Sequence, residues 1–422
     1  MKATFLLGSG ISRPAKLASV DELTELVLSG NGLIVEADGS CVAWDSARVR
    51  PEHEEVEGQA LLRKIRTLLD WLREKARARY AEFAQRQVNY EDLAYLAGQL
   101  EDDLLGDYEN PALQPFIRNA LIDLHGLFQE GACDKAREGL RVLAGTAVDY
   151  IRQVVALKLS VAPSDTSYLQ PFLDACRDSE VSELNLFTLN HDTVLEDFLT
   201  ANGVDVADGL RDASNGDGSR RWDPSVYDDS RCRARIFKLH GSVDWFRWEP
   251  YGGPWKDEAL AESTDRSDRF VGTYHPKDPM RPLYEQVSGQ PTLLAGTFNK
   301  ILAYNSGIFL ELHHRFHRAL SDCQTLVICG YGFADKGINT RIAEWRHLPS
   351  VPKLVIIDPA ESLQIVQRAR GAIQREIAAL HPDGYIGPLS PGLVVHWQHG
   401  LEARSAGTGD ALVTWERIRA AL

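Results

Sequence analysis

The sequence predicts an α/β protein with a doubly wound parallel sheet and a large helical insertion. Short apolar runs alternate with helical stretches near the start and over the later part of the chain, as in a sheet covered on both faces. Residues 55–180 have mostly helical spacing. A lone strand and helix before residue 50 could not bury their own apolar faces. We therefore expect one sheet domain, 1–50 and 181–422, interrupted by a helical insertion at 51–180; two independent domains are the less favoured alternative.

The first elements are a strand, a glycine turn and a helix. The apolar run Ala3–Leu7 stops at Gly8-Ser9-Gly10, as a buried strand does when it enters a tight turn. Ser19-Val20-Asp21-Glu22 then forms a capping box, and Gly30 lies where the helix would end.

The helical insertion begins with a long segment that has no proline and one glycine between Glu55 and Gln87. Its apolar residues recur at the spacing of one helix face. Three further stretches have the same character: 89–103, 111–130 and 135–159.

Strand-like runs then return, with helical stretches such as Ile308–Leu320 and Ser362–Leu380 between several of them. The polar segment Asp205–Asp229 predicts an exposed loop or hairpin. The predicted strands are Leu184–Leu189, Arg235–Leu239, Thr325–Cys329, Lys353–Ile357 and Leu393–Trp397.

Composition excludes several classes of protein. The 422 residues are 44% hydrophobic and 25% charged, as in soluble globular proteins, and the net charge of −14 disfavours direct nucleic-acid binding. No apolar run is long enough for a membrane span, and the start lacks a signal peptide, so we expect a cytoplasmic protein. The six cysteines are scattered without a C-x-x-C pair, so neither a zinc ribbon nor another metal site is expected.

Polar residues follow the first two strands, at the sheet edge where ligands bind in open parallel sheets. Glycines in the segment 8–12 let backbone N–H groups approach a phosphate. A dinucleotide fingerprint would have a third glycine where this chain has Arg13, so a plain structural turn is an alternative. Asn190, His191 and Asp192 follow the second strand, and burying them is costly unless they are paired or used. Asp192 could simply cap the next helix.

Further polar residues follow the later strands. His240 ends the third strand, where it could reach a ligand or be a satisfied structural histidine. A second glycine turn, Gly330-Tyr331-Gly332, precedes Asn339 on the next helix. Asp358 could accept the hydroxyls of a ribose or cap a helix.

These motifs together resemble the sirtuin-like domains of bacterial anti-phage defence systems. The resemblance implies a Rossmann-like fold that binds NAD+ and cleaves its nicotinamide–ribose bond, with Asn190 and His240 as catalytic residues. The motifs are Phe5–Ser12, Thr188–Asp192, Lys238–Ser242, Pro291–Lys300 and Gly330–Asp335 followed by Asn339. The implied NAD-binding residues are Gly8, Ser9, Gly10, Ser12, Asp192, Gly330, Tyr331, Gly332, Asn339 and Asp358.

Two departures from the sirtuin deacylases favour water as the acceptor. The four-cysteine zinc module is absent, and Arg13-Pro14-Ala15-Lys16 replaces the expected Gly-Ile-Pro-Asp-Phe-Arg run. The expected function is an NAD+ glycohydrolase that depletes NAD+ in anti-phage defence. The alternatives are a catalytically silent module that senses NAD or ADP-ribose through a partner and, less favoured, a protein deacylase.

An unrestrained NAD+ hydrolase would poison its own cell, so we expect restraint by assembly or by a partner. Homo-oligomerisation through the helical insertion is one expectation. The resemblance implies another, a separate partner such as a helicase or ATPase of the HerA type, a prokaryotic Argonaute or a phage-derived trigger. Two remaining patterns have plainer interpretations: His313 and His317 predict a solvated helix face, and the arginines at 220–235 predict solvated loop charges.

Overall fold

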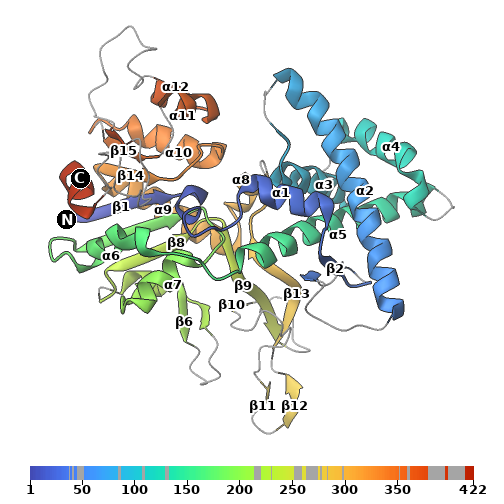
Figure 1. Ribbon diagram of the computed structural model, residues 1–422, viewed down its shortest axis with the longest axis horizontal. Helices are drawn as coiled ribbons and strands as arrows, with labels where there is room; N and C mark the ends of the chain where they lie inside the picture. The colour runs from blue at the N-terminus through green and yellow to red at the C-terminus, as the bar shows by residue number, and fades with distance from the viewer. Residues whose placement is uncertain are drawn as a thin grey trace. The chain divides into compact units, whose positions relative to one another are not determined.

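The structure is a computed structural model of the chain (Figure 1). It describes residues 1–37, 39, 42–44, 52–83, 87–106, 110–128, 133–212, 220–229, 231–250, 259–262, 274–275, 278–282, 284–296, 299–350, 352–358, 362–378, 395–397 and 414–422.

The chain divides into two compact units, a sheet unit and a helical unit. The sheet unit is Met1–Leu17, Val161–Gln286 and Lys300–Leu422, and the helical unit is Ala18–Ser160 and Val287–Asn299. This division differs from the predicted boundaries after residues 50 and 180. The reason is that α1 (Val20–Ser29) buries Leu23 and Val27 in the apolar core of the helical unit rather than on the sheet.

The sheet unit contains a seven-stranded parallel sheet in the order β16-β15-β14-β1-β4-β8-β5, which confirms the predicted α/β class. In Figure 1 the blue β1 lies between green and orange strands that come from distant parts of the chain. Residues 393–394 of the last predicted strand lie outside the described residues. The strands are β1 Lys2–Leu7, β4 Glu183–Thr188, β5 Val206–Ala207, β8 Ala234–Lys238, β14 Thr325–Cys329, β15 Lys353–Ile357 and β16 Val395–Trp397.

Helices cover both faces of this sheet, which explains why its strands are apolar on both sides. Phe5 of β1 packs against Phe172 of α6 (Gln170–Arg177), with ring centroids 5.5 Å apart. Phe187 of β4, whose register partner is the next β1 residue, Leu6, packs against Phe316 of α9 (Gly307–Asp322) at 4.9 Å. Neighbouring residues of a strand point to opposite faces, so α6 and α9 lie on opposite sides.

The strand order reverses at β1. The chain continues from β1 to β4 on one side and later returns to β14 on the other side. The register pairs Leu7 with Thr188 and with Cys329, so the segments that follow these three strands leave the sheet at one edge. Such a switch point is where ligands bind in doubly wound folds.

The sheet unit also contains elements that the sequence did not predict. An antiparallel sheet places β10 between β9 and β7, and β6 pairs with β7 as the predicted hairpin. The predicted helix Ser362–Leu380 is instead two short helices, separated near Gly371, whose φ is 74°. These strands are β6 Leu210–Asp212, β7 Arg220–Trp222, β9 Gly241–Pro250, β10 Ala259–Glu262, β11 Tyr274–His275, β12 Asp278–Pro282 and β13 Tyr284–Leu293, which crosses the unit division. The remaining helices are η1 Ser9–Ser12, η5 Ser167–Leu169, α7 Val194–Ala201, η6 Pro224–Asp228, α8 Asn299–Ala303, α10 Lys336–Arg346, α11 Ser362–Arg368, α12 Ile373–Ala378 and α13 Trp415–Ala421.

The helical unit confirms the helical character predicted for the insertion. Its first helix, α1, begins with the predicted capping box: Ser19 accepts from the backbone of Glu22, and Gly30 closes the helix in the left-handed region. Among the described residues, no helix has the length and apolarity needed to cross a membrane. The other elements are β2 Leu33–Val35, β3 Val42–Trp44, α2 Glu52–Phe83, α3 Tyr90–Leu105, η3 Pro111–Leu113, α4 Gln114–Asp123, η4 His125–Leu127 and α5 Cys133–Leu159.

Candidate functional site

The two glycine turns meet at the switch point of the sheet. The Gly8 N–H donates to the carbonyl of Cys329 at 3.0 Å, and the Gly10 N–H donates to the carbonyl of Gly330 at 2.9 Å. A Cβ on Gly8 would lie 2.6 Å from the Cα of Tyr331, and a Cβ on Gly10 would lie 2.7 Å from the Cα of Gly330. Close packing of the two loops therefore requires these glycines, and the loops use the two N–H groups themselves. The structural-turn alternative accounts for Gly8 and Gly10.

The predicted residues after β1 and β4 form one buried hydrogen-bonded chain. Asn190 donates from Nδ2 to Ser12 Oγ at 3.0 Å, and Ser12 Oγ donates to Asp192 Oδ2 at 2.8 Å. The second oxygen of Asp192 accepts from the backbone N–H of Val194 at 3.2 Å, at the start of α7. Asp192 thus holds the helix start, as the capping alternative expects, and also ties the first glycine loop to the β4 turn.

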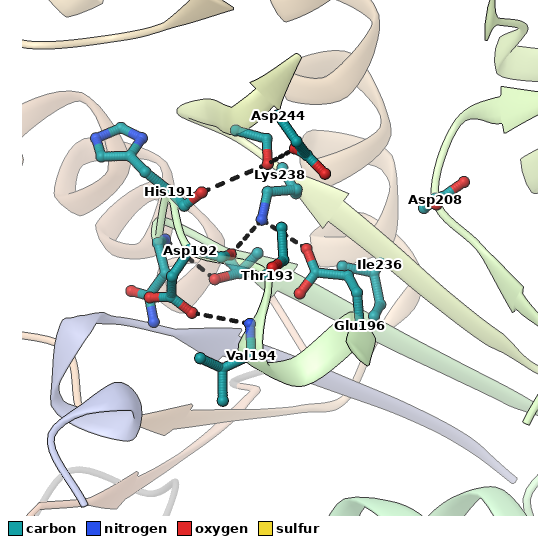
Figure 2. Close-up of polar contacts among 12 residues, drawn as sticks. His191, Asp192, Thr193, Val194, Glu196, Asp208, Ile236, Lys238 and Asp244 are labelled. Carbon is teal, nitrogen blue, oxygen red and sulfur yellow. Dashed lines mark hydrogen bonds and ion pairs between the residues drawn. The ribbon is translucent and has the colours of Figure 1, made fainter. Parts of the chain in front are cut away.

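A buried lysine supports this turn from the end of β8. Figure 2 shows Lys238 Nζ between the main-chain oxygen of Asp192 and the carboxylate of Glu196; both contacts are 2.5 Å. The Lys238 side chain is 2% exposed. Burial disfavours the ammonium ion, but the carboxylates of Glu196, Asp244 and Asp192 outweigh this effect and raise the pKa of Lys238. Lys238 is therefore a charged anchor of the segment that carries Asn190.

Sequence reasoning did not select Lys238 or Glu196 as site residues. The sequence did contain a signal for Lys238, because this charged residue lies at the end of an apolar strand, two residues before His240. A buried lysine needs a partner, but its partner Glu196 lies 42 residues away.

His240 is held by a tyrosine and a carboxylate. Its Nε2 lies 2.9 Å from the hydroxyl of Tyr304 and 3.1 Å from Oδ2 of Asp335, and the Tyr304 hydroxyl also donates to Asp335. Burial acts to raise the pKa of Asp335. The hydrogen bonds from His240 and Tyr304, with the charges of His240 and Lys300, outweigh burial and hold that pKa well below its usual value. Asp335 is therefore an anion beside the imidazole.

Asn190 and His240 follow equivalent positions on neighbouring strands. Thr188 of β4 is in register with Lys238 of β8, and the backbone N–H of Leu239 donates to the carbonyl of Thr188 at 2.9 Å. Both candidate catalytic residues therefore leave the sheet at the same edge, two residues beyond that pair. Both are buried, with exposures of 6% and 4%.

Two buried polar atoms at this edge lack a hydrogen-bond partner among the described residues: Oδ1 of Asn190 and Nδ1 of His191. The His191 ring lies 6.2 Å from the His240 ring, centroid to centroid. Burial, together with the charges of His240 and Lys300, lowers the pKa of His191 well below its usual value, so this ring is neutral at pH 7. Buried polar atoms normally have partners, and a polar ligand at this edge would supply them.

The second glycine loop is supported from below by Asn339. Its amide accepts from the Tyr331 hydroxyl at 2.8 Å and donates to the carbonyls of Phe333 and Arg370, both at 2.8 Å. Asn339 is completely buried, so these bonds place it under the loop and give it a supporting role. Gly332 differs, because a Cβ there would meet nothing within 4 Å. It is the position of this loop with open space beside it.

Asp358 directly follows β15, as predicted, and Arg368 of α11 donates to its carboxylate. The side chain is buried, and its charge contributes, after burial itself, to raising the pKa of Cys329 on the neighbouring strand. A ribose at this position would share the carboxylate with Arg368. The alternative of a helix cap falls on residues 359–361, which lie outside the described residues.

Tyr168 is a site candidate that sequence reasoning missed. Its hydroxyl is buried and has no hydrogen-bond partner among the described residues. The backbone N–H of Ser164 donates to Ala15 at 3.1 Å, which brings this segment beside the end of the first glycine loop. Burial, and then the charge of Asp192, raises the pKa of Tyr168. Nothing in the sequence indicated that Tyr168 belongs to a site, because its spacing in residues 55–180 predicts only helix.

The two plainer interpretations have different outcomes. His314 and His317 of α9 are exposed, but the prediction of a solvated face is wrong for His313. His313 is buried, bonds the carbonyl of Leu239 at 3.1 Å and stacks on Tyr304, and burial lowers its pKa to about 3. Arginines of the 220–235 cluster pair with carboxylates, as in Arg220–Asp208 at 2.8 Å.

Within the described ranges, no group of three or more His, Cys, Asp or Glu residues could hold a metal ion.

The fold is α/β, and the candidate site lies at the switch point of its sheet, where ligands bind in doubly wound folds. Residues 184–374 match the family model described as SIR2-like domain, and domains of that family use NAD+. The match includes Asn190, His240, Asp358 and the second glycine loop, whereas the first glycine loop precedes it. No curated protein matches the chain. The resemblance to sirtuin-like domains is thereby confirmed.

Proposed function

We propose that the protein is an NAD+ glycohydrolase that cleaves NAD+ to nicotinamide and ADP-ribose. The observation that carries this proposal is the buried amide of Asn190. Its Nδ2 is held by Ser12 of the first glycine loop, and its Oδ1 has no partner among the described residues. That atom lies at the sheet edge that also carries His240. A fixed, unpartnered acceptor at the same sheet edge as an imidazole suits a water molecule or a ribose hydroxyl.

The nicotinamide leaving group needs no protonation by the protein. When the bond between the nicotinamide nitrogen and ribose C1′ breaks, its electron pair returns to the pyridinium ring, so nicotinamide leaves as a neutral molecule. Positive charge develops on the ribose, as in glycoside hydrolysis. Water then adds to C1′ and releases a proton. Asn190 orients water or a ribose hydroxyl without adding charge, and His240 accepts the proton as a general base, which is worth about 10²–10⁴-fold in rate.

Water is the favoured acceptor because the chain lacks the four-cysteine module and the Asp-Phe-Arg run of sirtuin deacylases. In a cell, this activity would deplete NAD+, and the resemblance to defence-associated domains supports a role in anti-phage defence. Restraint by self-assembly, or by a partner such as a HerA-type ATPase, belongs to the same proposal.

The test is to incubate the purified full chain with NAD+ and to separate nicotinamide from ADP-ribose by chromatography. We expect both products in equal amounts from the wild type, and at least about 10²-fold less from Asn190→Ala and His240→Ala. His314→Ala, an exposed histidine of α9, is the matched control and should keep full activity.

NAD+ binding measured by calorimetry separates the alternatives. Binding without product, in the wild type and in both variants, would contradict hydrolysis and favour the sensing module. Full cleavage by both variants would remove Asn190 and His240 from the chemistry. Product that appears only when an acylated peptide is added would favour a deacylase.

A further inference from the structure

We propose that Asp335, assisted by Tyr304, is a positioning residue that fixes His240 with its proton on Nε2, so that Nδ1 is the basic atom of the ring. This inference rests on the proposed function in one respect, namely that His240 acts as the base. The hydrogen-bond pattern on which it depends can be tested without any turnover.

The hydrogen-bonding partners of His240 determine which of its ring nitrogens carries the proton. An ionised carboxylate can only accept hydrogen bonds, and Oδ2 of Asp335 lies 3.1 Å from Nε2 of His240. Tyr304 donates its hydroxyl proton to Asp335, so toward His240 its oxygen acts as an acceptor at 2.9 Å. Both neighbours of Nε2 therefore require an N–H there. In the neutral ring the lone pair is then on Nδ1.

The carboxylate is fixed in place by the helix that it caps. The other oxygen of Asp335 accepts from the backbone N–H groups of Gly337 at 2.9 Å and Ile338 at 3.0 Å, at the start of α10. A Cβ on Gly337 would lie 2.7 Å from the Tyr304 ring, so tyrosine and helix start are also in close contact. One side chain thus joins the second glycine loop, α10 and the imidazole.

The aromatic groups around His240 restrict rotation of its ring. The Tyr304 ring stacks on His240, with centroids 5.9 Å apart and planes 14° apart, and on His313 at 3.7 Å. The guanidinium of Arg341 lies over the Tyr304 ring, 5.4 Å from its centroid. His240 therefore has a fixed orientation as well as a fixed proton.

The charges that face His240 give Asp335 a second role. An anion beside the imidazole stabilises the imidazolium that forms when His240 accepts a proton. Lys300 is a cation that acts against the positive charge of the imidazolium, whereas the rings of His191 and His313 are neutral. Among the described residues, the groups that interact with His240 or with Asp335 include Tyr304, His191, His313 and Lys300.

The decisive substitution is Asp335→Asn, which keeps the size and an oxygen able to cap α10. Its amide group places a donor where the carboxylate accepted, so His240 Nε2 would become an acceptor and the proton would move to Nδ1. In serine proteases the equivalent change reduces kcat by about 10⁴-fold through the wrong tautomer. Here we expect a fall in kcat of about 10²–10⁴-fold with little change in KM. The acidic limb of the pH–rate profile should move to lower pH, because the imidazolium loses its counter-charge.

The tautomer itself can be read from ¹⁵N-histidine NMR of the full chain, with the His240 signal assigned by its loss in His240→Gln. We expect a protonated Nε2 in the wild type and a protonated Nδ1 in Asp335→Asn. Tyr304→Phe is the matched variant, because it removes one acceptor but keeps the ring and the carboxylate. It should retain the Nε2–H form and lose far less kcat than Asp335→Asn.

A wild-type signal with the proton on Nδ1 would overturn the inference whatever the activity. So would Asp335→Asn that folds and keeps wild-type kcat, and in that case hydrolysis by Asn190 and His240 would still stand. If the protein released no nicotinamide at all, the proposed function would fail, while the NMR spectrum would still decide the tautomer.

Discussion

The two units of the chain bury different kinds of side chains. Among the described residues, the core of the helical unit is almost entirely apolar, and its few buried polar groups include Thr24, Asp92 and Gln153. Thr24 and Asp92 make hydrogen bonds near helix starts, and Gln153 accepts from the backbone of Val42. In the sheet unit, many buried polar residues lie at the carboxyl ends of the parallel strands or in the segments that follow them: Ser12, Thr188, Asn190, His191, Asp192, Lys238, His240 and Asp358.

This difference indicates which unit would carry the proposed reaction. Buried polar side chains cost stability unless they are paired, so the two atoms at this sheet edge that have no partner among the described residues, Oδ1 of Asn190 and Nδ1 of His191, favour a binding role for the edge. The apolar helical core needs no such explanation, since it buries surface and stabilises its own unit. Substitutions in the two units should therefore separate stability from turnover.

The largest expected effect is that of Lys238→Met. Above pH 7, where Glu196 is ionised, it removes one partner of a buried ion pair and leaves Glu196 without its cation, which costs about 3–5 kcal/mol. Because Lys238 also holds the main chain of Asp192, NAD+ cleavage should fall even in protein that remains folded. Denaturant unfolding and nicotinamide release measure the two effects.

Leu93→Ala in α3 is the matched control in the helical unit. Leu93 is completely buried, so its truncation should cost about 2–5 kcal/mol, a loss similar to that of Lys238→Met. Turnover per folded molecule should nevertheless remain at the wild-type level. A loss of turnover in Leu93→Ala equal to that in Lys238→Met would end the functional distinction between the units.

The next effect is a pH dependence of stability from Glu196. Burial raises the pKa of Glu196 from 4.5 to about 7, against the opposing charge and hydrogen bond of Lys238. The folded state therefore binds more protons than the unfolded state between these values. This contribution to stability is fully present below pH 4.5 and is lost as pH rises through about 7, by at most about 3 kcal/mol.

Unfolding free energies measured at several pH values between 4.5 and 8 test this expectation. Glu196→Gln, which cannot ionise, should have a flatter profile over the same range. An equal slope in the variant and the wild type would assign the titration to another group.

The comparison also shows what could be predicted from the sequence. The strands Thr325–Cys329 and Lys353–Ile357 were predicted at their observed bounds, because continuous apolar runs between turns are a local signal. The residues at strand ends followed from the same signal. The sequence did not predict that α1 belongs to the helical unit, because an amphipathic helix does not show which apolar surface will cover it.

The contacts that hold His240 in place could not be predicted from the sequence either. Tyr304 lies 64 residues from His240 and 31 from Asp335, so no local spacing joins the three. His313 lies beside the apolar stripe of α9 that contains Leu312 and Phe316, and its burial depends on the packing of that helix. Partners of this kind are determined by the tertiary fold.

The smallest expected effect separates two glycines of one loop. Gly330 has a φ of 63°, and a Cβ there would lie 2.6 Å from the backbone nitrogen of Ile11. Gly330→Ala should therefore cost at least about 1–3 kcal/mol in unfolding free energy, from the left-handed backbone alone. Gly332→Ala meets nothing within 4 Å and should leave stability within about 0.5 kcal/mol of the wild type. If this open space receives part of NAD+, Gly332→Ala should instead raise KM for NAD+ cleavage with kcat nearly unchanged. A variant with wild-type KM would place the substrate away from Gly332, and the contact between the two glycine loops would then be the main reason for glycine in this turn.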